Sequence, residues 1–337
     1  MISLTLKGSR VLVTGGAGFI GSHIVEHLVK EGVDVIVYDN FSSGKLSNLG
    51  NLRKNIKIIK GDILDYSKLR DAVKGVDYVS HQAAQLEIFK CIEEPARDLE
   101  VNTIGTLNVL KASVAENVKK IVNASSACVY GQAQKIPEDE VHPKNPNWPY
   151  GVSKLAAEKY CEIFSHNYNI PIVNLRYGIV YGEREWFGRV LTIFLMRTIL
   201  EKPLVIFGDG KQIRDFIHVA DVAEAHNLCF EKDVRGPFNI GTGRGTKINH
   251  LAHIIDELTN SAAGIISEDV QEGEESNLIP GRRRIPSELR TMILDSTRAR
   301  TELGWDPKVS LNEGLRRELK WITINPDEWE TEGTIRV

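Results

Sequence analysis

The sequence is short of several features that would mark particular classes of protein. Only four cysteines occur among its 337 residues, and no two of them form a CxxC pair. Neither a disulfide framework nor a zinc or other metal site is therefore expected, and a reducing cytoplasm is the expected compartment. No apolar run approaches the roughly 20 residues that span a bilayer, and the N-terminus lacks the apolar core of a signal peptide, so no membrane partner is expected.

An excess of charge of either sign is also lacking. The 42 Lys and Arg residues nearly balance the 45 Asp and Glu residues, which gives a formal net charge of -3. Such a balance provides no electrostatic footprint for DNA, RNA or an anionic membrane, so no nucleic-acid partner is expected. With 42% hydrophobic and 26% charged residues, the chain has the composition of a globular protein with one large or two modest domains.

The first half of the chain alternates short β-branched runs with longer amphipathic stretches. This pattern predicts an α/β fold, in which parallel strands are joined by crossover helices and covered on both faces. The predicted strands are 11–13, 33–38, 56–60, 77–80, 120–123 and 170–175, and the predicted helices cover about 18–31, 97–117 and 150–167. After Leu175 the alternation weakens, which predicts a second, smaller region.

Two later segments stand apart from this alternation. Residues 268–288 are rich in Gly, Pro and charge, and structureless loops of that length are uncommon unless they are functional. We therefore expect an ordered loop over a site or a mobile flap. Residues 325–337 are expected to form a frayed or loosely docked end.

A glycine pattern follows the first predicted strand. Gly15, Gly18 and Gly21 stand between that strand and the next helix, the context expected of a dinucleotide-binding loop. Glycines there allow a tight turn and a close approach of the backbone to a pyrophosphate, whose charge faces the N–H groups at the helix start. The alternative is a glycine-rich turn without a ligand.

Two acidic residues continue this pattern. Asp39, which ends the second strand, can accept hydrogen bonds from both ribose hydroxyls and would repel a 2′-phosphate, so NAD is favoured over NADP. Asp62, after the third strand, is a candidate partner for the adenine amine. Either residue could instead simply begin a turn.

Tyr150 and Lys154 are the candidate reactive groups. Their spacing of four places both side chains on one face of a predicted helix. A free tyrosine has a pKa of about 10 and is too weak a base near neutrality, so a nearby cation such as Lys154 is needed to stabilise its phenolate. The alternative is a solvent-facing pair on an amphipathic helix. The segment 123–131 follows a predicted strand and adds hydroxyl groups that could hold a substrate oxygen.

At these residues the chain resembles the extended short-chain dehydrogenases/reductases of the nucleotide-sugar epimerase and dehydratase family, and within it the UDP-hexose and UDP-hexuronate 4-epimerases. The similar segments span residues 11 to about 305 and include 14–22, Asp39, 61–63, 81–84, 102–106, 125–131, 149–154, 175–177, 207–210, 214–218 and 238–241. The resemblance implies a Rossmann-type doubly wound sheet. The predicted NAD-binding domain covers 1–176, with 211–240 returning to it, and 177–210 with 241–337 form the predicted nucleotide-sugar-binding region.

The resemblance also implies a mechanism. NAD would take a hydride from C4 of the sugar while Tyr150 removes the hydroxyl proton, and the hydride would return after the 4-keto sugar rotates. Ser126 would orient the hydroxyl, Lys154 would hold the nicotinamide ribose, and Arg214 would contact the diphosphate. The predicted NAD-binding residues are Gly15, Gly18, Phe19, Ile20, Gly21, Asp39, Asn40, Asp62, Ile63, Ala83, Ala84, Asn102, Tyr150 and Lys154. The predicted substrate-binding residues are Gln85, Ser126, Ala127, Cys128, Tyr177, Arg189, Arg214 and Arg284.

Two positions distinguish branches of the family. The 4,6-dehydratases carry an acidic pair where this chain has Ala127 and Cys128, and the decarboxylating relatives carry a Glu at the position of Cys128. A 4-epimerase needs neither acid, so their absence favours it. Cys128 also resembles the cysteine of 3,5-epimerases, which exchanges protons next to a ketone. Segment 184–189 lacks the partner lysine of that family, and a lone cysteine is more often a packed residue.

On the substrate side the chain departs from the family pattern. The Asn that usually follows Arg-Tyr-Phe is absent from segment 176–179, so one diphosphate contact is lost. In segment 282–288 either Arg283 or Arg284 is the predicted phosphate ligand, unless these arginines are solvated surface charges. Arg184 and Arg189 suggest that the sugar carries a carboxylate, as in UDP-glucuronic acid, whereas the alternative is that both face solvent or pair with nearby glutamates.

Three functions remain open from the sequence. The leading one is a nucleotide-sugar 4-epimerase, and the second is a 3,5-epimerase or 4,6-dehydratase on the same scaffold. The third is a non-catalytic NAD-sensing protein, against which the intact Tyr150 and Lys154 argue. The resemblance further implies a homodimer that is formed through the helices near 97–117 and 150–167.

Overall fold

The computed structural model describes residues 6–185 and 188–328, and its centre is a seven-stranded parallel sheet. The strand order is β11-β6-β5-β4-β1-β2-β3, so the order reverses beside β1. The strands are β1 (Arg10–Thr14), β2 (Asp34–Asp39), β3 (Lys57–Lys60), β4 (Tyr78–His81), β5 (Lys120–Ser126), β6 (Ile172–Tyr177) and β11 (Gly236–Ile240). In an open α/β sheet, ligands bind outside the carboxyl ends of the strands at such a reversal.

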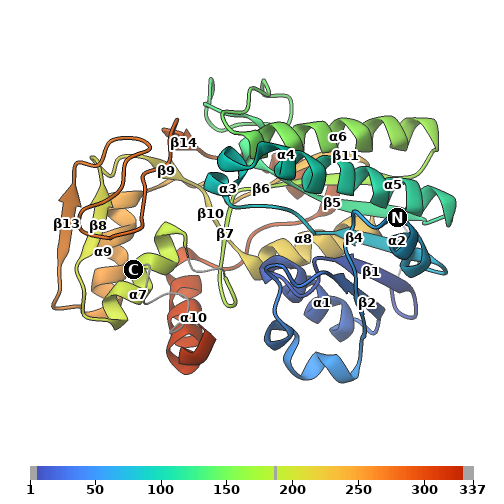
Figure 1. Ribbon diagram of the computed structural model, residues 1–337, viewed down its shortest axis with the longest axis horizontal. Coiled ribbons are helices and arrows are strands. Elements are labelled where there is room, and N and C mark those ends of the chain that lie inside the picture. The colour runs from blue at the N-terminus through green and yellow to red at the C-terminus, as the bar shows by residue number, and fades with distance from the viewer. Residues whose placement is uncertain (1–5, 186–187, 329–337) are drawn as a thin grey trace.

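Helices cover both faces of this sheet, as Figure 1 shows. Val25 of α1 and Val222 of α8 belong to the apolar core on one face, and Leu69 of α2, Leu110 of α5 and Cys161 of α6 belong to the core on the other. The helices are α1 (Phe19–Lys30), α2 (Tyr66–Val73), α5 (Thr106–Ala115), α6 (Pro149–Asn167) and α8 (Val219–Glu231). The inner strands β1, β2, β5 and β6 are rich in apolar residues, because helices bury both of their faces.

The predicted α/β class and the six predicted strands are confirmed, with boundaries that differ by three residues at most. Strand β11 was not predicted, although it extends the sheet beyond β6. The predicted helix 97–117 begins two residues earlier and is not uniform, because α4 (Pro95–Leu99) leads into the π-helical segment η2 (Glu100–Gly105) before α5. The widened turn contains Asn102, a predicted site residue.

A smaller part of the molecule lies beside the carboxyl end of the sheet (Figure 1). Its short strands are β7 (Ile179–Tyr181), β8 (Leu204–Phe207), β9 (Ile213–Arg214), β10 (Phe216–His218), β12 (Thr246–Lys247), β13 (Ile265–Glu268) and β14 (Thr291–Met292). Its helices are α7 (Val190–Ile199), α9 (Ile248–Thr259) and α10 (Leu311–Ile324), and shorter elements elsewhere are η1 (Leu46–Lys54), α3 (Ile88–Glu93), η3 (Ala127–Val129), η4 (Ala299–Leu303) and η5 (Pro326–Glu328). A third apolar core packs α7, α9 and α10 around Phe194 and Leu251.

The loop predicted over 268–288 is ordered. It follows β13, contains no regular helix or strand, and is held to the start of α6, where Trp148 Nε1 donates a hydrogen bond to Pro286 O at 2.7 Å. Of the predicted loose end, residues 329–337 lie outside the described part of the chain. No helix in the described part is long and apolar enough to cross a membrane.

Candidate active site

The glycine loop at the end of β1 is shaped for a close-lying ligand. Gly15 has φ 65°, and a Cβ atom there would lie 2.7 Å from Ala83 N. A Cβ atom at Gly21 would lie 2.1 Å from Gly15 O, so the turn closes only without side chains. Helix α1 then begins at Phe19, and no side chain caps its N-terminus. This positive helix end fits the pyrophosphate of NAD.

Asp39 lies at the end of β2 beside this loop. Its Oδ2 accepts a hydrogen bond from Ala17 N at 2.9 Å, and its Oδ1 accepts one from Phe41 N at 2.8 Å. Burial raises the pKa of Asp39, and both backbone bonds oppose that rise. The residue therefore braces the glycine loop and also forms the turn that the sequence offered as the alternative role.

Asn40 and Asp62, two predicted NAD-binding residues, lie next to each other. Asn40 Nδ2 donates to Asp62 Oδ2 at 3.0 Å, and Leu64 N donates to Asp62 Oδ1 at 2.9 Å. Asp62 also forms a turn, as its alternative role predicted, and Ile63 behind it is buried.

The segment after β4 carries Ala83, Ala84 and Gln85. Asn102 holds its backbone at both polar groups of Gln85, accepting from Gln85 N at 2.8 Å and donating to Gln85 O at 2.9 Å. The same amide donates to Ser153 Oγ on α6 at 3.1 Å. The π-helical segment η2 thus ties this loop to the helix that carries the reactive residues.

Tyr150 and Lys154 are buried on α6, at 5% and 4% exposure. The solvent-facing pair considered as an alternative is therefore excluded. Burial lowers the pKa of Lys154 to about 8, and its Nζ donates to Ala124 O at 2.7 Å. Burial raises the pKa of Tyr150 well above its usual range, while Arg189 and a hydrogen bond with Ser126 lower it. Tyr150 is thus a neutral phenol that needs further positive charge to act as a base.

Ser126, Ala127 and Cys128 continue from β5 into η3. Ser126 Oγ accepts a hydrogen bond from Cys128 N at 3.2 Å and caps this short turn. Burial raises the pKa of Cys128, and the opposing effects of Ser126, Arg189 and Arg214 do not outweigh it. Cys128 is therefore a thiol near neutrality, which disfavours a role for its thiolate in proton exchange.

The predicted phosphate ligands converge on one carboxylate. Arg214 Nη2 lies 3.4 Å from Glu288 Oε1, and Arg284 Nε lies 3.2 Å from Glu288 Oε2. Arg283 instead pairs with Glu93 Oε1 at 2.5 Å and stacks over the ring of Phe89. The structure therefore brings Arg284, and not Arg283, next to Arg214.

Of the two arginines suggested for a sugar carboxylate, only one lies near the reactive residues. Arg189 donates to Val180 O at 3.0 Å and lies 3.5 Å from Glu185 Oε1, and its charge lowers the pKa of Tyr150 and of Cys128. Arg184 faces elsewhere. Its guanidinium is turned toward α1, where it pairs with Glu26 Oε2 at 2.8 Å, and it donates to Asn48 O in η1.

The sequence analysis missed Glu288 and Glu158 as functional candidates. Glu288 stands inside the segment that was interpreted only for its arginines. Glu158 lies four residues after Lys154 on the same face of α6, so the spacing that identified Tyr150 and Lys154 also indicates Glu158. Tyr177, a predicted substrate contact, is buried at the end of β6, and its hydroxyl donates to Gln82 Oε1 at 3.4 Å.

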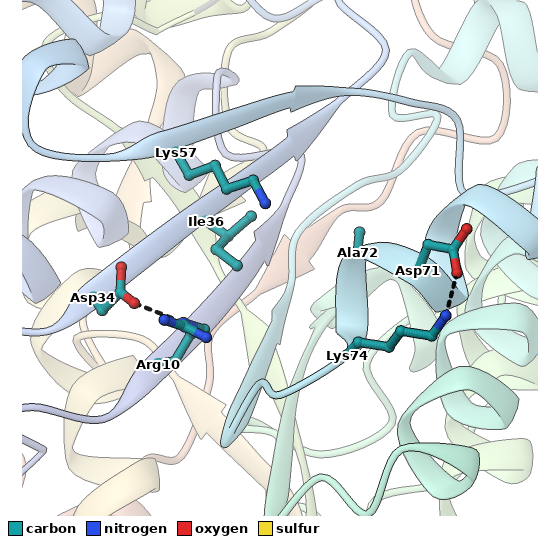
Figure 2. A pocket seen from close by; sticks show the side chains of 7 residues that line it. All are labelled: Arg10, Asp34, Ile36, Lys57, Asp71, Ala72 and Lys74. Atoms are coloured by element: carbon teal, nitrogen blue, oxygen red, sulfur yellow. Dashed lines mark hydrogen bonds and ion pairs between the residues drawn. The ribbon is translucent and has the colours of Figure 1, made fainter.

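A cavity of about 210 Å³ lies away from these residues, and Figure 2 shows the side chains that line it. Four of its five charged side chains form ion pairs, Arg10 with Asp34 and Lys74 with Asp71, both at 2.6 Å, and Lys57 is the fifth. Arg10 begins β1 and Asp34 begins β2, so this cavity lies at the amino ends of the strands. It is separate from the predicted nucleotide site, which lies at their carboxyl ends.

Comparison with known families agrees with this geometry. A family model for the NAD dependent epimerase/dehydratase family matches residues 11–241. The chain belongs to this family. Its activity is therefore that of an NAD-dependent nucleotide-sugar epimerase or dehydratase. A curated family member, the putative UDP-glucose 4-epimerase of Methanocaldococcus jannaschii, is 38% identical over 94% of this chain and 99% of the relative.

Solved structures of family members share the fold. UDP-glucose 4-epimerase of Thermotoga maritima with UDP-glucose has a TM-score of 0.86 at 38% identity, covering 94% of this chain and 99% of that one. The Thermus thermophilus UDP-glucose 4-epimerase complex with NAD has a TM-score of 0.82 at 35% identity, with 93% and 99% covered. MoeE5 with UDP-glucuronic acid and NAD has a TM-score of 0.82 at 30% identity, with 94% and 100% covered.

Family members with another reaction are nearly as similar. UDP-glucuronic acid decarboxylase 1 of Arabidopsis thaliana is 31% identical over 97% of this chain and 73% of the relative. Overall similarity thus indicates the family and NAD, whereas the choice of reaction depends on individual residues.

Proposed function

We propose that this chain is a 4-epimerase of a UDP-linked hexose or hexuronate. The observation that carries the proposal is the composition of segment 126–128 beside Tyr150, where Ala127 and Cys128 provide no carboxylate and Cys128 has a raised pKa. Without an acid or base at these positions, little chemistry is available to a keto intermediate except the return of the hydride. Relatives named as UDP-glucose 4-epimerases support the same choice.

The residues of the chain have separate tasks in this reaction. Bound NAD supplies the hydride acceptor and donor at C4. Ser126 holds the sugar hydroxyl, and Tyr150 removes and later returns its proton. Lys154 and the positive nicotinamide ring together offset the burial that raises the pKa of Tyr150. Arg214 and Arg284 bind the diphosphate, for which charge-assisted guanidinium contacts are suited.

The product and the fate of hydrogen test the proposal. The protein is incubated with UDP-glucose, UDP-galactose, UDP-glucuronic acid and GDP-mannose in heavy water and followed by NMR. A 4-epimerase inverts C4 without deuterium entering carbon. Deuterium at C3 or C5 would show a 3,5-epimerase, elimination of water would show a 4,6-dehydratase, and no reaction would favour an NAD-sensing protein. The Tyr150→Phe variant is the inactive control.

Arg189 supports a second candidate, a hexuronate substrate. Its charge acts on both Tyr150 and Cys128, so a sugar bound beside these residues lies within its reach. The Arg189→Ala variant should lower kcat/KM for UDP-glucuronic acid by about tenfold to hundredfold, the usual loss for a charged contact. Turnover of UDP-glucose should fall less, and only because Arg189 no longer lowers the pKa of Tyr150. Arg184→Ala is the matched control, and equal turnover of UDP-glucuronic acid by both variants would remove the support for a uronate.

A second copy of the chain is the proposed protein partner. Apolar side chains remain exposed on α6 and on the α4–η2 segment that contacts it, among them Leu99, Ile104, Val152 and Ile163 at 44–52% exposure. Several exposed apolar side chains on neighbouring helices support an interface there. Two such helix pairs would form a four-helix contact about a twofold axis.

The division into an NAD-binding and a sugar-nucleotide-binding domain stays a prediction.

A further inference from the structure

A buried carboxylate lies directly behind the reactive residues. Glu158 is 5% exposed on α6 and faces the neighbouring strands β5 and β6. Its Oε1 accepts hydrogen bonds from Ser125 Oγ at 2.5 Å and from Arg176 Nε at 2.9 Å, and its Oε2 accepts one from Arg176 Nη2 at 2.6 Å. One side chain therefore joins α6 to the ends of two strands.

The guanidinium of Arg176 is equally enclosed, at 2% exposure. Besides its bidentate contact with Glu158, its Nη1 donates to Tyr130 Oη and to Glu140 O, both at 2.9 Å. Tyr130 Oη donates in turn to Asn239 Oδ1 of β11 at 2.6 Å. A buried guanidinium is tolerated only with partners of this quality, so each member of the network depends on the others.

Each end of this network adjoins a residue of the predicted reaction. Ser125 precedes Ser126, and Glu158 follows Lys154 by one helical turn. Lys154 Nζ donates to Ala124 O, which is also on β5. The position of α6 on β5 therefore sets the distance between the serine hydroxyl and the groups that handle its proton. Errors of about 1 Å in such a geometry can cost a hundredfold in rate.

The charge of Glu158 also acts on Lys154. Burial lowers the pKa of Lys154, whereas the neighbouring Cys161, Asp98 of α4 and Glu158 raise it. His81 of β4 faces the same ammonium. Burial and the charge of Lys154 lower the pKa of His81 to about 3, so this imidazole is neutral and adds no charge beside Lys154. Without the charge of Glu158, the buried cation of Arg176 would no longer be neutralised, and Lys154 would lose a nearby negative charge. Lys154 would then lose its proton at a lower pH.

We propose that Glu158 is a positioning residue for the reaction, which with Arg176 and Ser125 fixes Ser126 relative to α6 and keeps Lys154 cationic. This inference rests on the proton-handling roles proposed for Tyr150 and Lys154. It assigns to a buried ion pair a function beyond holding the fold together.

The first test uses variants that separate charge from geometry in the NAD-bound protein. In Glu158→Gln, kcat should fall by about tenfold to hundredfold while KM changes little, and the alkaline limb of the pH profile should move down by about one unit. Glu158→Asp keeps the charge but not the reach, so its alkaline limb should stay in place while kcat falls. Asp221→Asn is the control for a general loss of stability. Asp221 is a buried carboxylate on α8 that accepts hydrogen bonds from Lys308 N and Val309 N, neither of which lies on α6.

A second readout requires no turnover. The ammonium of Lys154 is titrated by NMR in each protein, with the same protein carrying Lys154→Met as the reference that assigns its signal. The ammonium should lose its proton at lower pH in Glu158→Gln than in the wild type, because the carboxylate that raises its pKa is gone. If the wild type shows no 4-epimerisation, the proposed function fails, and this titration still decides the role of Glu158.

Some results would overturn the inference. An unchanged kcat, alkaline limb and Lys154 titration in Glu158→Gln would do so, as would an equal shift in Asp221→Asn. If Glu158→Gln does not fold, the double variant Glu158→Gln/Arg176→Met removes both charges, and such replacements of buried pairs are often tolerated. A folded double variant with wild-type kcat would show that the ion pair does not position the reactive groups.

Discussion

At the scale of single residues, chemistry with a short sequence signature was predictable. The glycine loop, Asp39 and the spacing of Tyr150 and Lys154 all depend on neighbours along the chain, and the structure places each at the carboxyl edge of the sheet. The partner of Arg284 was not predictable in this way. Arg284 pairs with Glu288 and Arg283 pairs with Glu93 because of how the long loop folds back, and two adjacent arginines in a sequence do not indicate which partner each will have.

Glu138 gives a prediction for stability. Burial, with a contribution from Asp215, raises its pKa to about 8 from 4.5, although a backbone hydrogen bond opposes the shift. The folded protein then holds a proton that the unfolded chain releases above pH 4.5, so stability falls as the pH rises from 4.5 to 8, by about 3–5 kcal/mol. The Glu138→Gln variant should lose less Tm between pH 5 and pH 8 than the wild type. The exposed Glu100→Gln is the control, and equal Tm changes in both variants would contradict the prediction.

At the scale of elements, continuous apolar runs predicted six strands because both faces of the sheet are buried. Strand β11 was not predicted because it begins with Gly236 and Pro237 and contains the polar Asn239. The side chain of Asn239 is buried and donates a hydrogen bond to Glu138 O. The place of β11 beside β6 depends on pairing between segments far apart in sequence. The π-helical segment around Asn102 was not predicted for a similar reason, because Asn102 contacts Gln85 and Ser153 only after the chain folds.

The loop between β13 and β14, residues 269–290, gives a prediction at this scale. Glu288 occupies the guanidinium groups of Arg214 and Arg284, and its like charge would repel a diphosphate that approaches them. The Glu288→Gln variant should therefore bind UDP about threefold to tenfold more tightly, with a steeper dependence on salt. Isothermal titration calorimetry measures both effects. Glu275→Gln, an exposed position of the same loop, is the control, and weaker binding of UDP by Glu288→Gln would show that the carboxylate assists the substrate.

At the scale of the whole molecule, the sequence order of the strands hides their spatial order. Residues of the site come from β1, β2, β4, β5 and β6 and from the smaller part beside them (Figure 1). Parallel strands bring their carboxyl ends to one edge, so a motif after each strand predicts convergence there. The meeting of Arg214, Arg284 and Glu288 lacks such a rule, because these residues belong to short strands and loops whose register is set by long-range contacts.

The exposed face of α6 provides the last prediction, for assembly. Val152 and Ile163 are about half exposed, and a face that is covered by a second copy should not tolerate a charge. The Ile163→Glu variant should remain folded but shift from dimer to monomer at micromolar concentration, as measured by sedimentation velocity. Ile266→Glu is the matched control, because Ile266 is 38% exposed on β13, away from α6. A dimer that persists in Ile163→Glu, or a wild type that is monomeric, would contradict assembly through this face.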